Sequence, residues 1–153
     1  MSDLNQQMVV SEFVTVNVDG QAFGLPIERV QDVFMLHQMT RVPLAPDDIA
    51  GIINLRGRIV TAIDLRRRLG MPDSGRKPSM AVGIECAGES YGLVIDAVGE
   101  VLKLGVETAE PVPVNLDDRL KCVASGVHRL EAGLLVVLDV DQLLDLKVTE
   151  IAA

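Results

Sequence analysis

The sequence predicts an all-β protein that consists of two small barrels, and three observations support this fold class. Apolar residues recur in short alternating or continuous runs bounded by Gly, Asp and Pro, a pattern typical of strands. Helical periodicity is scarce, and the chain contains an internal duplication. With 153 residues, the chain is long enough to form one domain or two small lobes around a buried core.

Four pairs of apolar runs predict β-hairpins, closed by turn pairs such as Asp19–Gly20 and Arg56–Gly57. In chain order, the paired runs are 13–18 with 21–25, 51–55 with 58–63, 80–86 with 90–94, and 126–130 with 134–138. The stretches 71–78 and 109–120 contain prolines and are expected to be loops.

Helices are expected only as short connectors. Asp64 is a suitable N-cap for a helix over 65–69, and Gly70 follows as a stop residue. Asp139 or Asp141 would cap a further turn near the C-terminus.

The duplication is visible as two blocks of matching residues. Residues 24–33 overlay 92–101 with seven matches in ten, and 51–64 overlay 126–139. The blocks are offset by 68 and 75 residues, so an insertion of seven residues separates them; we place it in the loop at 111–121. The matches include turn glycines and acidic positions as well as aliphatic residues, which favours a true repeat of one β unit.

Each repeat unit of about 65 residues contains roughly five strands, and closure into a barrel is the natural way to bury their apolar faces. We expect the first barrel at approximately 12–78 and the second at approximately 79–146. An exchange of strands between the barrels remains open at this point. Residues 1–11 and 147–153 are expected to be flexible tails.

Composition argues against several classes of protein. The net charge is −8, and the aromatic residues are three Phe, one Tyr and no Trp, so nucleic-acid binding is not expected. The N-terminus lacks the features of a secretory signal, and no apolar run is long enough to insert into a membrane, so we expect a cytoplasmic protein. Cys86 and Cys122 lack redox or zinc-ligand spacing and are interpreted as small buried thiols.

Basic residues gather in one part of the chain. Residues 41–77 carry eight of the fourteen basic side chains against four acids, a balance of +4, and the remainder has a balance of −12. Such a bipolar distribution suits the electrostatic steering of protein partners. Within it, 66–68 is interpreted as a solvated Arg-rich turn. Arg56 lies at a hairpin tip between aliphatic neighbours, where it either binds a partner or is simply exposed to solvent.

No catalytic centre, metal site or cofactor site is expected. His37 and His128 are isolated among apolar neighbours, and nucleotide-binding and hydrolase motifs are absent. Asp64 and Asp139 occupy equivalent positions of the repeat and could form a carboxylate pair. Because each precedes a helical turn, helix capping is favoured. A small β-barrel enzyme or ligand-binding protein that uses this pair is the less favoured alternative.

Several motifs resemble the CheW family of chemotaxis coupling proteins. They are 23–33 (FGLPIERVQDV), 42–46 (VPLAP), 51–60 (GIINLRGRIV), 63–66 (IDLR), 91–98 (YGLVIDAV) and 138–144 (LDVDQLL). The resemblance covers 12–146 and implies a single domain of two SH3-like five-stranded barrels. It also implies a non-catalytic adaptor that couples the cytoplasmic tips of chemoreceptors, the methyl-accepting chemotaxis proteins, to the regulatory domain of the histidine kinase CheA. Such an adaptor is cytoplasmic and is recruited to membrane-associated receptor arrays.

The resemblance implies a receptor-binding site at Val30, Asp32 and Arg56, with Asn54, Leu55 and Arg58 as supporting interface residues. Val30 would bury apolar surface against a receptor helix, and the two charged side chains would orient it. Asp32 stands where the family often carries Glu, which shortens the reach of the carboxylate. The same adaptor role in a non-flagellar chemosensory pathway is an alternative that the sequence does not separate from flagellar chemotaxis.

Overall fold

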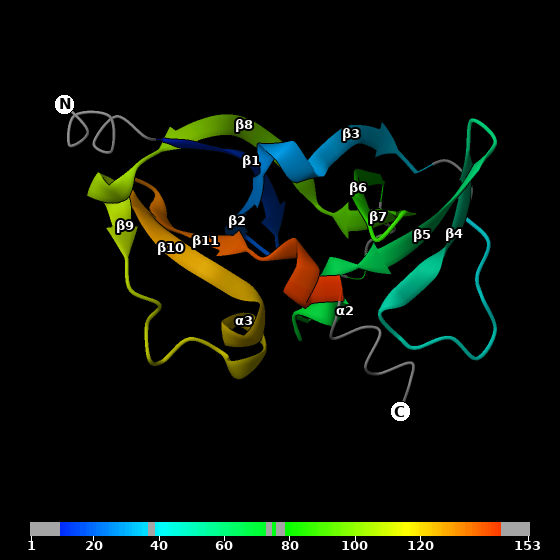
Figure 1. Cartoon of the computed structure of the whole chain (residues 1–153). Coiled ribbons are helices and arrows are strands. Elements are labelled where there is room, and N and C mark those ends of the chain that lie inside the picture. The colour runs from blue at the N-terminus through cyan, green and yellow to red at the C-terminus, as the bar shows by residue number, and fades with distance from the viewer. Residues whose placement is uncertain (1–9, 37–38, 73–74, 76–78, 145–153) are drawn as a thin grey trace.

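The computed structural model describes residues 10–36, 39–72, 75 and 79–144. Its strands are β1 (Ser11–Val18), β2 (Gln21–Pro26), β3 (Val30–Met35), β4 (Ile49–Leu55), β5 (Arg58–Asp64), β6 (Met80–Cys86), β7 (Glu89–Ile95), β8 (Ala97–Leu104), β9 (Ala109–Glu110), β10 (Ala124–Leu130) and β11 (Gly133–Leu138) (Figure 1). The helical elements are η1 (Ile27–Arg29), α2 (Leu65–Arg68), η2 (Val106–Thr108) and α3 (Asp118–Val123), and residues 140–144 are also helical. The all-β fold class is confirmed, and the four predicted hairpins form as expected.

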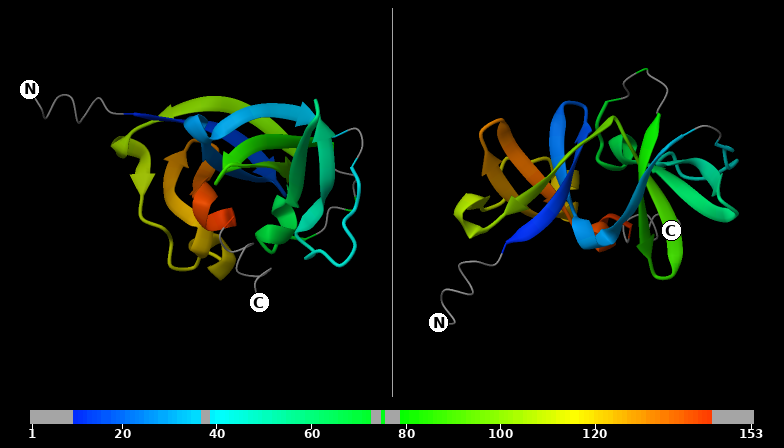
Figure 2. Two further views of the ribbon diagram at one scale, coloured as in Figure 1. Left: turned by 45° about the vertical axis from the view of Figure 1, so that its right-hand side comes forward. Right: turned by 90° about the horizontal axis from the view of Figure 1, so that it is seen from above.

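The strands form two sheets, which Figure 2 shows as two lobes side by side. One sheet has the order β8-β1-β2-β11-β10-β9, and we call its barrel the terminal barrel because it contains the first and last strands. The other has the order β3-β6-β7-β5-β4, and we call its barrel the middle barrel. Under the repeat, β8, β1, β2, β11 and β10 correspond to β3, β6, β7, β5 and β4. The two barrels therefore have the same strand order, and the terminal barrel adds only the short β9.

The sheets do not divide the chain near residue 78, where the sequence analysis placed the boundary. Strands β1 and β2 leave the first half of the chain and join the sheet that β8, β10 and β11 build. Parallel pairing makes this exchange, because Phe23 in β2 lies opposite Val136 in β11 and Tyr91 in β7 lies opposite Thr61 in β5. Hairpins are local and follow from turn residues, whereas pairing between hairpins is not local and leaves no mark on the alternation of each strand.

Three apolar clusters match this arrangement. The largest joins the two sheets face to face and includes Val16 and Phe23 from the terminal barrel with Val82 and Leu93 from the middle barrel. A second lies inside the middle barrel and a third inside the terminal barrel. Alternation along β7 divides its side chains between two of them, because Leu93 faces the junction and Val94 faces the barrel interior.

The sequence suggested a solvated turn at the three arginines of α2, but only Arg67 is exposed, and Arg66 and Arg68 are buried. Arg66 is 11% exposed and bridges two carboxylates, Nη1 to Asp19 Oδ1 at 2.9 Å and Nη2 to Asp96 Oδ2 at 2.6 Å. Arg68 is 3% exposed and pairs with Asp48 at 2.7 Å. Buried charges require partners, and a helix of four residues is too short to show in its periodicity which side chains face inward.

Three other expectations change in part. The predicted loop 109–120 contains β9 and the start of α3, which Asp117 caps by accepting a hydrogen bond from the backbone N–H of Arg119. Much of the loop 71–78 lies outside the described residues, as do residues 1–9 of the predicted N-terminal tail and all of the predicted C-terminal tail. Cys122 is exposed rather than buried, and Cys86 is only half-buried. Burial raises the pKa of the Cys86 thiol.

Membrane insertion was not expected from the sequence. In the part of the chain that the structure describes, no helix is long and apolar enough to span a bilayer.

Candidate interaction site

The first group of predicted site residues, Val30 and Asp32, lies on β3, an edge strand in the sheet of the middle barrel. Val30 is half-buried and packs against the largest apolar cluster, which joins the two sheets. The register between β3 and β6 shifts between Val30 and Asp32, which leaves Gln31 as the extra residue of a bulge. Gln31 Nε2 donates to Glu85 Oε2 at 2.7 Å. Val30 and Asp32 lie on either side of this bulge, which sets the local course of the edge strand.

Asp32 lies directly over Gly83 of the neighbouring strand. A Cβ at position 83 would overlap Asp32 Oδ1, and the ring of Phe34 lies 3.4 Å from the same point. Because Gly83 has no side chain, the Asp32 carboxylate can lie close to β6, and Asp32 is half-buried.

The second group lies on the β4–β5 hairpin. Arg56 and Gly57 form its tip with φ values of +54° and +83°, so the backbone is left-handed at both positions. Asn54 Oδ1 accepts a hydrogen bond from Gly57 N at 3.0 Å and thereby fixes the turn. Leu55 packs against the middle-barrel core. Of the predicted hairpin residues, Arg56 and Arg58 therefore present exposed charge, while Asn54 and Leu55 hold the tip in place.

The two groups come from opposite ends of the strand order, β3 and β4, and the barrel interior joins them. Phe34 of β3 and Leu55 of β4 pack against the same cluster. Thr40, which follows β3 in the chain, forms an isolated bridge with Ile52 of β4. One rigid barrel therefore carries both groups.

Exposed apolar side chains accompany these residues. Val33 and Met35 on β3 are 43% and 51% exposed, and Ile59 beside Arg58 is 61% exposed. Arginine next to exposed apolar surface is characteristic of protein interfaces. The sequence analysis missed these three residues. Strand alternation could have found them, because each is one position away from an inward-facing residue.

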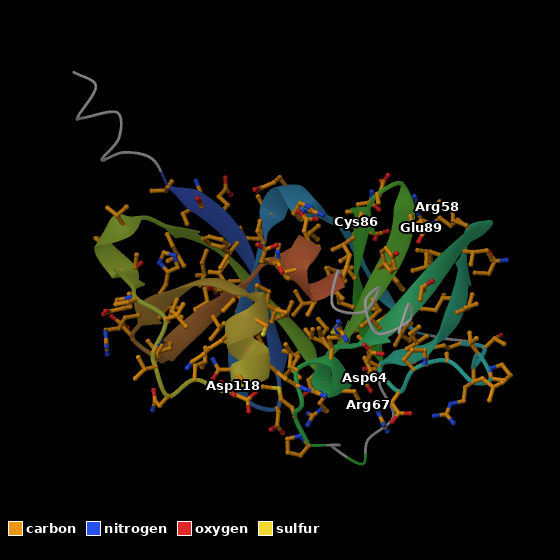
Figure 3. All side chains as sticks on the ribbon, turned by 60° about the horizontal axis from the view of Figure 1, so that its bottom comes forward. Arg58, Asp64, Arg67, Cys86, Glu89 and Asp118 are labelled. Carbon is orange, nitrogen blue, oxygen red and sulfur yellow. The ribbon has the colours of Figure 1, made fainter. Side chains whose placement is uncertain are left out.

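The aspartate pair is a pair of helix caps, as the capping interpretation predicted. Asp64 Oδ1 accepts from Arg67 N at 3.4 Å, and Asp139 Oδ1 accepts from Gln142 N at 3.1 Å. Figure 3 shows Asp64 and Arg67 at one end of β5 and Arg58 at the other, so the cap is remote from the hairpin tip. Across the described residues, His, Cys, Asp and Glu form no group of three that could hold a metal ion.

Comparison with known proteins assigns this architecture. The family model described as "CheW-like domain" matches residues 12–148. The chain belongs to the CheW family. It is 30% identical over 145 residues to the chemotaxis protein CheW of Klebsiella aerogenes, covering 94% of this chain and 87% of that protein. It is 23% identical over 145 residues to CheW of Thermotoga maritima, covering 95% of each.

A solved structure shows the same fold. The crystal structure of the scaffolding protein TtCheW from Thermoanaerobacter tengcongensis superposes with a TM-score of 0.75 at 29% identity, covering 85% of this chain and 89% of that one. Proteins of the CheW family are non-catalytic scaffolds of chemotaxis signalling, and this chain is one of them. The resemblance inferred from the motifs is thereby confirmed.

Proposed function

We propose that this CheW-family scaffold couples the cytoplasmic tips of chemoreceptors to the histidine kinase CheA. The observation that carries the proposal is the middle-barrel surface, on which Arg56 stands at a rigid, exposed hairpin tip of the same barrel as Val30 and Asp32. A receptor helix offers an amphipathic face to such a surface. Apolar burial at Val30 would supply affinity, and the charges of Asp32 and Arg56 would set the orientation of the helix.

The supporting residues act through the shape of the tip. Asn54 closes the turn and Leu55 anchors it in the core, so both position Arg56, whereas Arg58 and its neighbour Ile59 extend the exposed surface. The kinase partner is proposed from the family resemblance, and it would act at a surface separate from the receptor site. The protein would then work in the cytoplasm and be recruited to membrane-associated receptor arrays.

Co-sedimentation tests both parts of this proposal. The purified protein is mixed with receptor-containing membranes, with and without CheA, and the kinase activity of the pellet is measured. The proposal expects receptor-dependent sedimentation of the protein and a rise in kinase activity that requires all three components. The test uses receptors and kinases from the same cell as the protein. Sedimentation that does not depend on the receptor, together with unchanged kinase activity, would contradict the proposal.

A further inference from the structure

A cavity in the terminal barrel is not explained by the scaffold role proposed above. It has a volume of about 240 Å³ and opens between the start of β1, η1 and β10. Phe13, Pro26 and Val137 supply apolar walls, and Glu12, Glu28 and His128 supply polar groups. Arginine and lysine do not occur among its described lining residues. The cavity therefore offers acceptors and apolar surface but no basic side chain.

Comparison of the two barrels shows that this space is open in only one of them. Gly126 lines the cavity, and a Cβ at this position would meet no atom within 4 Å. Its equivalent under the repeat is Gly51, where a Cβ would lie 2.6 Å from both Met39 Cγ and Thr40 O. In the middle barrel, the chain itself fills the corresponding position. In the terminal barrel, the same position is available to a group from outside.

The contacts of Thr108 bear on which ring nitrogen of His128 can accept a hydrogen bond. Thr108 Oγ1 lies 3.4 Å from Gly105 O and 2.9 Å from His128 Nδ1. The Thr108 hydroxyl has one proton: given to Gly105 O, it leaves Oγ1 to accept from Nδ1–H, and given to Nδ1, it leaves Nε2 protonated; the site proposed below requires the first arrangement. The other ring nitrogen, Nε2, then carries a lone pair and no proton. Phe13 packs on the ring at a centroid distance of 5.7 Å and helps to fix its orientation.

The carboxylates add negative charge at the rim of the cavity. Glu28 lies in the first turn of η1 and is exposed. Glu12 is also exposed, but it faces Lys103 across the β1–β8 ladder. Glu28 is therefore the carboxylate with more of its charge available to a ligand in the cavity.

We infer that this cavity binds an arginine side chain presented by a protein partner. A volume of about 240 Å³ is below the usual range for small-molecule sites, roughly 300–1,000 Å³, and suits a single side chain. The methylene stem of arginine fits the apolar walls, and its planar guanidinium can donate to both a carboxylate and a second acceptor. Glu28 and His128 Nε2 are those acceptors. Most of the cavity lies on the terminal barrel, but Glu28 on η1 lies two residues before Val30 of the proposed receptor surface, so the two sites adjoin at this connector.

The first test is the tautomer of His128 in the free protein. Long-range ¹H–¹⁵N correlations distinguish a protonated Nδ1 from a protonated Nε2 at a pH where the ring is neutral. The inference expects the proton on Nδ1 and predicts that Thr108→Val, which removes the acceptor, shifts the equilibrium toward Nε2–H. A proton on Nε2 in the unsubstituted protein would overturn the assigned geometry.

The second test is a titration with the amide of acetyl-arginine, followed by the backbone amide signals of the ¹⁵N-labelled protein. We expect saturable shifts at Phe13 and at 125–128, with a dissociation constant in the range of about 1 mM, as for a weak single-group contact. The amide of acetyl-citrulline keeps the shape and removes the charge, and it should bind at least about fivefold more weakly. Equal shifts with both probes, or none with the arginine probe up to about 10 mM, would overturn the inference.

Variants locate the binding in the cavity. Glu28→Gln should weaken the arginine probe about two- to fivefold, which is the usual loss for an exposed charge pair. Gly126→Leu should abolish binding by filling the cavity, since a side chain has room to start at this position. Glu131→Gln removes another exposed carboxylate, at the β10–β11 tip, and should leave binding unchanged. Binding that survives Gly126→Leu would place the probe elsewhere and overturn the site.

Discussion

The middle and terminal barrels share five strands in the same order, yet they differ at equivalent positions that the fold does not require to match. Arg56 at the β4–β5 tip corresponds to Glu131 at the β10–β11 tip. Buried Arg68 corresponds to buried Leu143, and Tyr91 corresponds to Phe23. What the copies share, the strand alternation and the capping aspartates, specifies the barrel. What they do not share gives each barrel its own surface, and this difference provides the tests below.

The largest effect on stability is expected at Arg68. Arg68→Met leaves Asp48, which is 7% exposed, without its ion pair, and should lower the free energy of unfolding by about 3–5 kcal/mol. Urea denaturation measures this change. The apolar equivalent, Leu143, shows that the other barrel needs no charge at this position, so the double variant with Asp48→Asn should recover part of the loss.

Arg67→Met is the matched control for that experiment. The Arg67 side chain is 47% exposed, and its substitution should change the free energy of unfolding by less than about 1 kcal/mol. Equal losses for Arg67→Met and Arg68→Met would contradict the assignment of the buried pair.

Tyr91 distinguishes the barrels at alkaline pH. Burial, together with a hydrogen bond from its hydroxyl to Glu89 Oε2 at 2.7 Å, raises the pKa of Tyr91 from 10.0 to about 12. The unfolded chain therefore loses this proton first, so the stabilisation is fully present below about pH 10 and is lost as the pH rises toward the folded value.

Tyr91→Phe makes the middle barrel match Phe23 of the terminal barrel and removes this titration. Loss of the hydrogen bond should lower the free energy of unfolding of the variant by about 1 kcal/mol at pH 7. Between about pH 10 and 12, its free energy of unfolding should fall less steeply than that of the unsubstituted protein. Chemical denaturation at a series of pH values gives both profiles. Parallel alkaline slopes would show that Tyr91 ionises alike in the folded and unfolded states.

The helix caps should make the two barrels equivalent again. Asp64→Ala and Asp139→Ala should each cost about 1 kcal/mol of unfolding free energy, and the double variant should cost about their sum because the two caps act on different helices. Thermal and urea unfolding of the three variants check this. A pair that acts as one unit would instead give a double variant no worse than either single one.

Prediction from the sequence succeeded where the controlling interactions are local. The hairpins follow from alternation and turn pairs, and Asp64 caps α2 as its position predicted. The division of the chain between barrels depends on the parallel pairing of β2 with β11, which no local pattern records. The burial of Arg66 and Arg68 was missed because it depends on carboxylates that lie 20 or more residues away along the chain.

The candidate site was predictable only in part. The family motif suggested Val30, Asp32 and Arg56 as site residues; all three lie on one barrel, and their role stays a prediction. The motif alone does not reveal that Asn54 and Leu55 support the tip, since the role of Asn54 depends on a hydrogen bond from Gly57 and that of Leu55 on packing against the barrel core. The exposed apolar neighbour Ile59 was missed, although strand alternation could have found it.

The most direct test of the central claim reverses the charge at the two equivalent tips. Binding of a receptor cytoplasmic fragment is measured for the unsubstituted protein, for Arg56→Glu and for Glu131→Arg, after denaturation has shown that all three are equally stable. The account predicts that Arg56→Glu weakens binding about tenfold or more, a loss of about 1.4 kcal/mol, and that Glu131→Arg leaves it unchanged. Unchanged affinity for Arg56→Glu, or equal losses for both variants, would contradict the placement of the receptor site on the middle barrel.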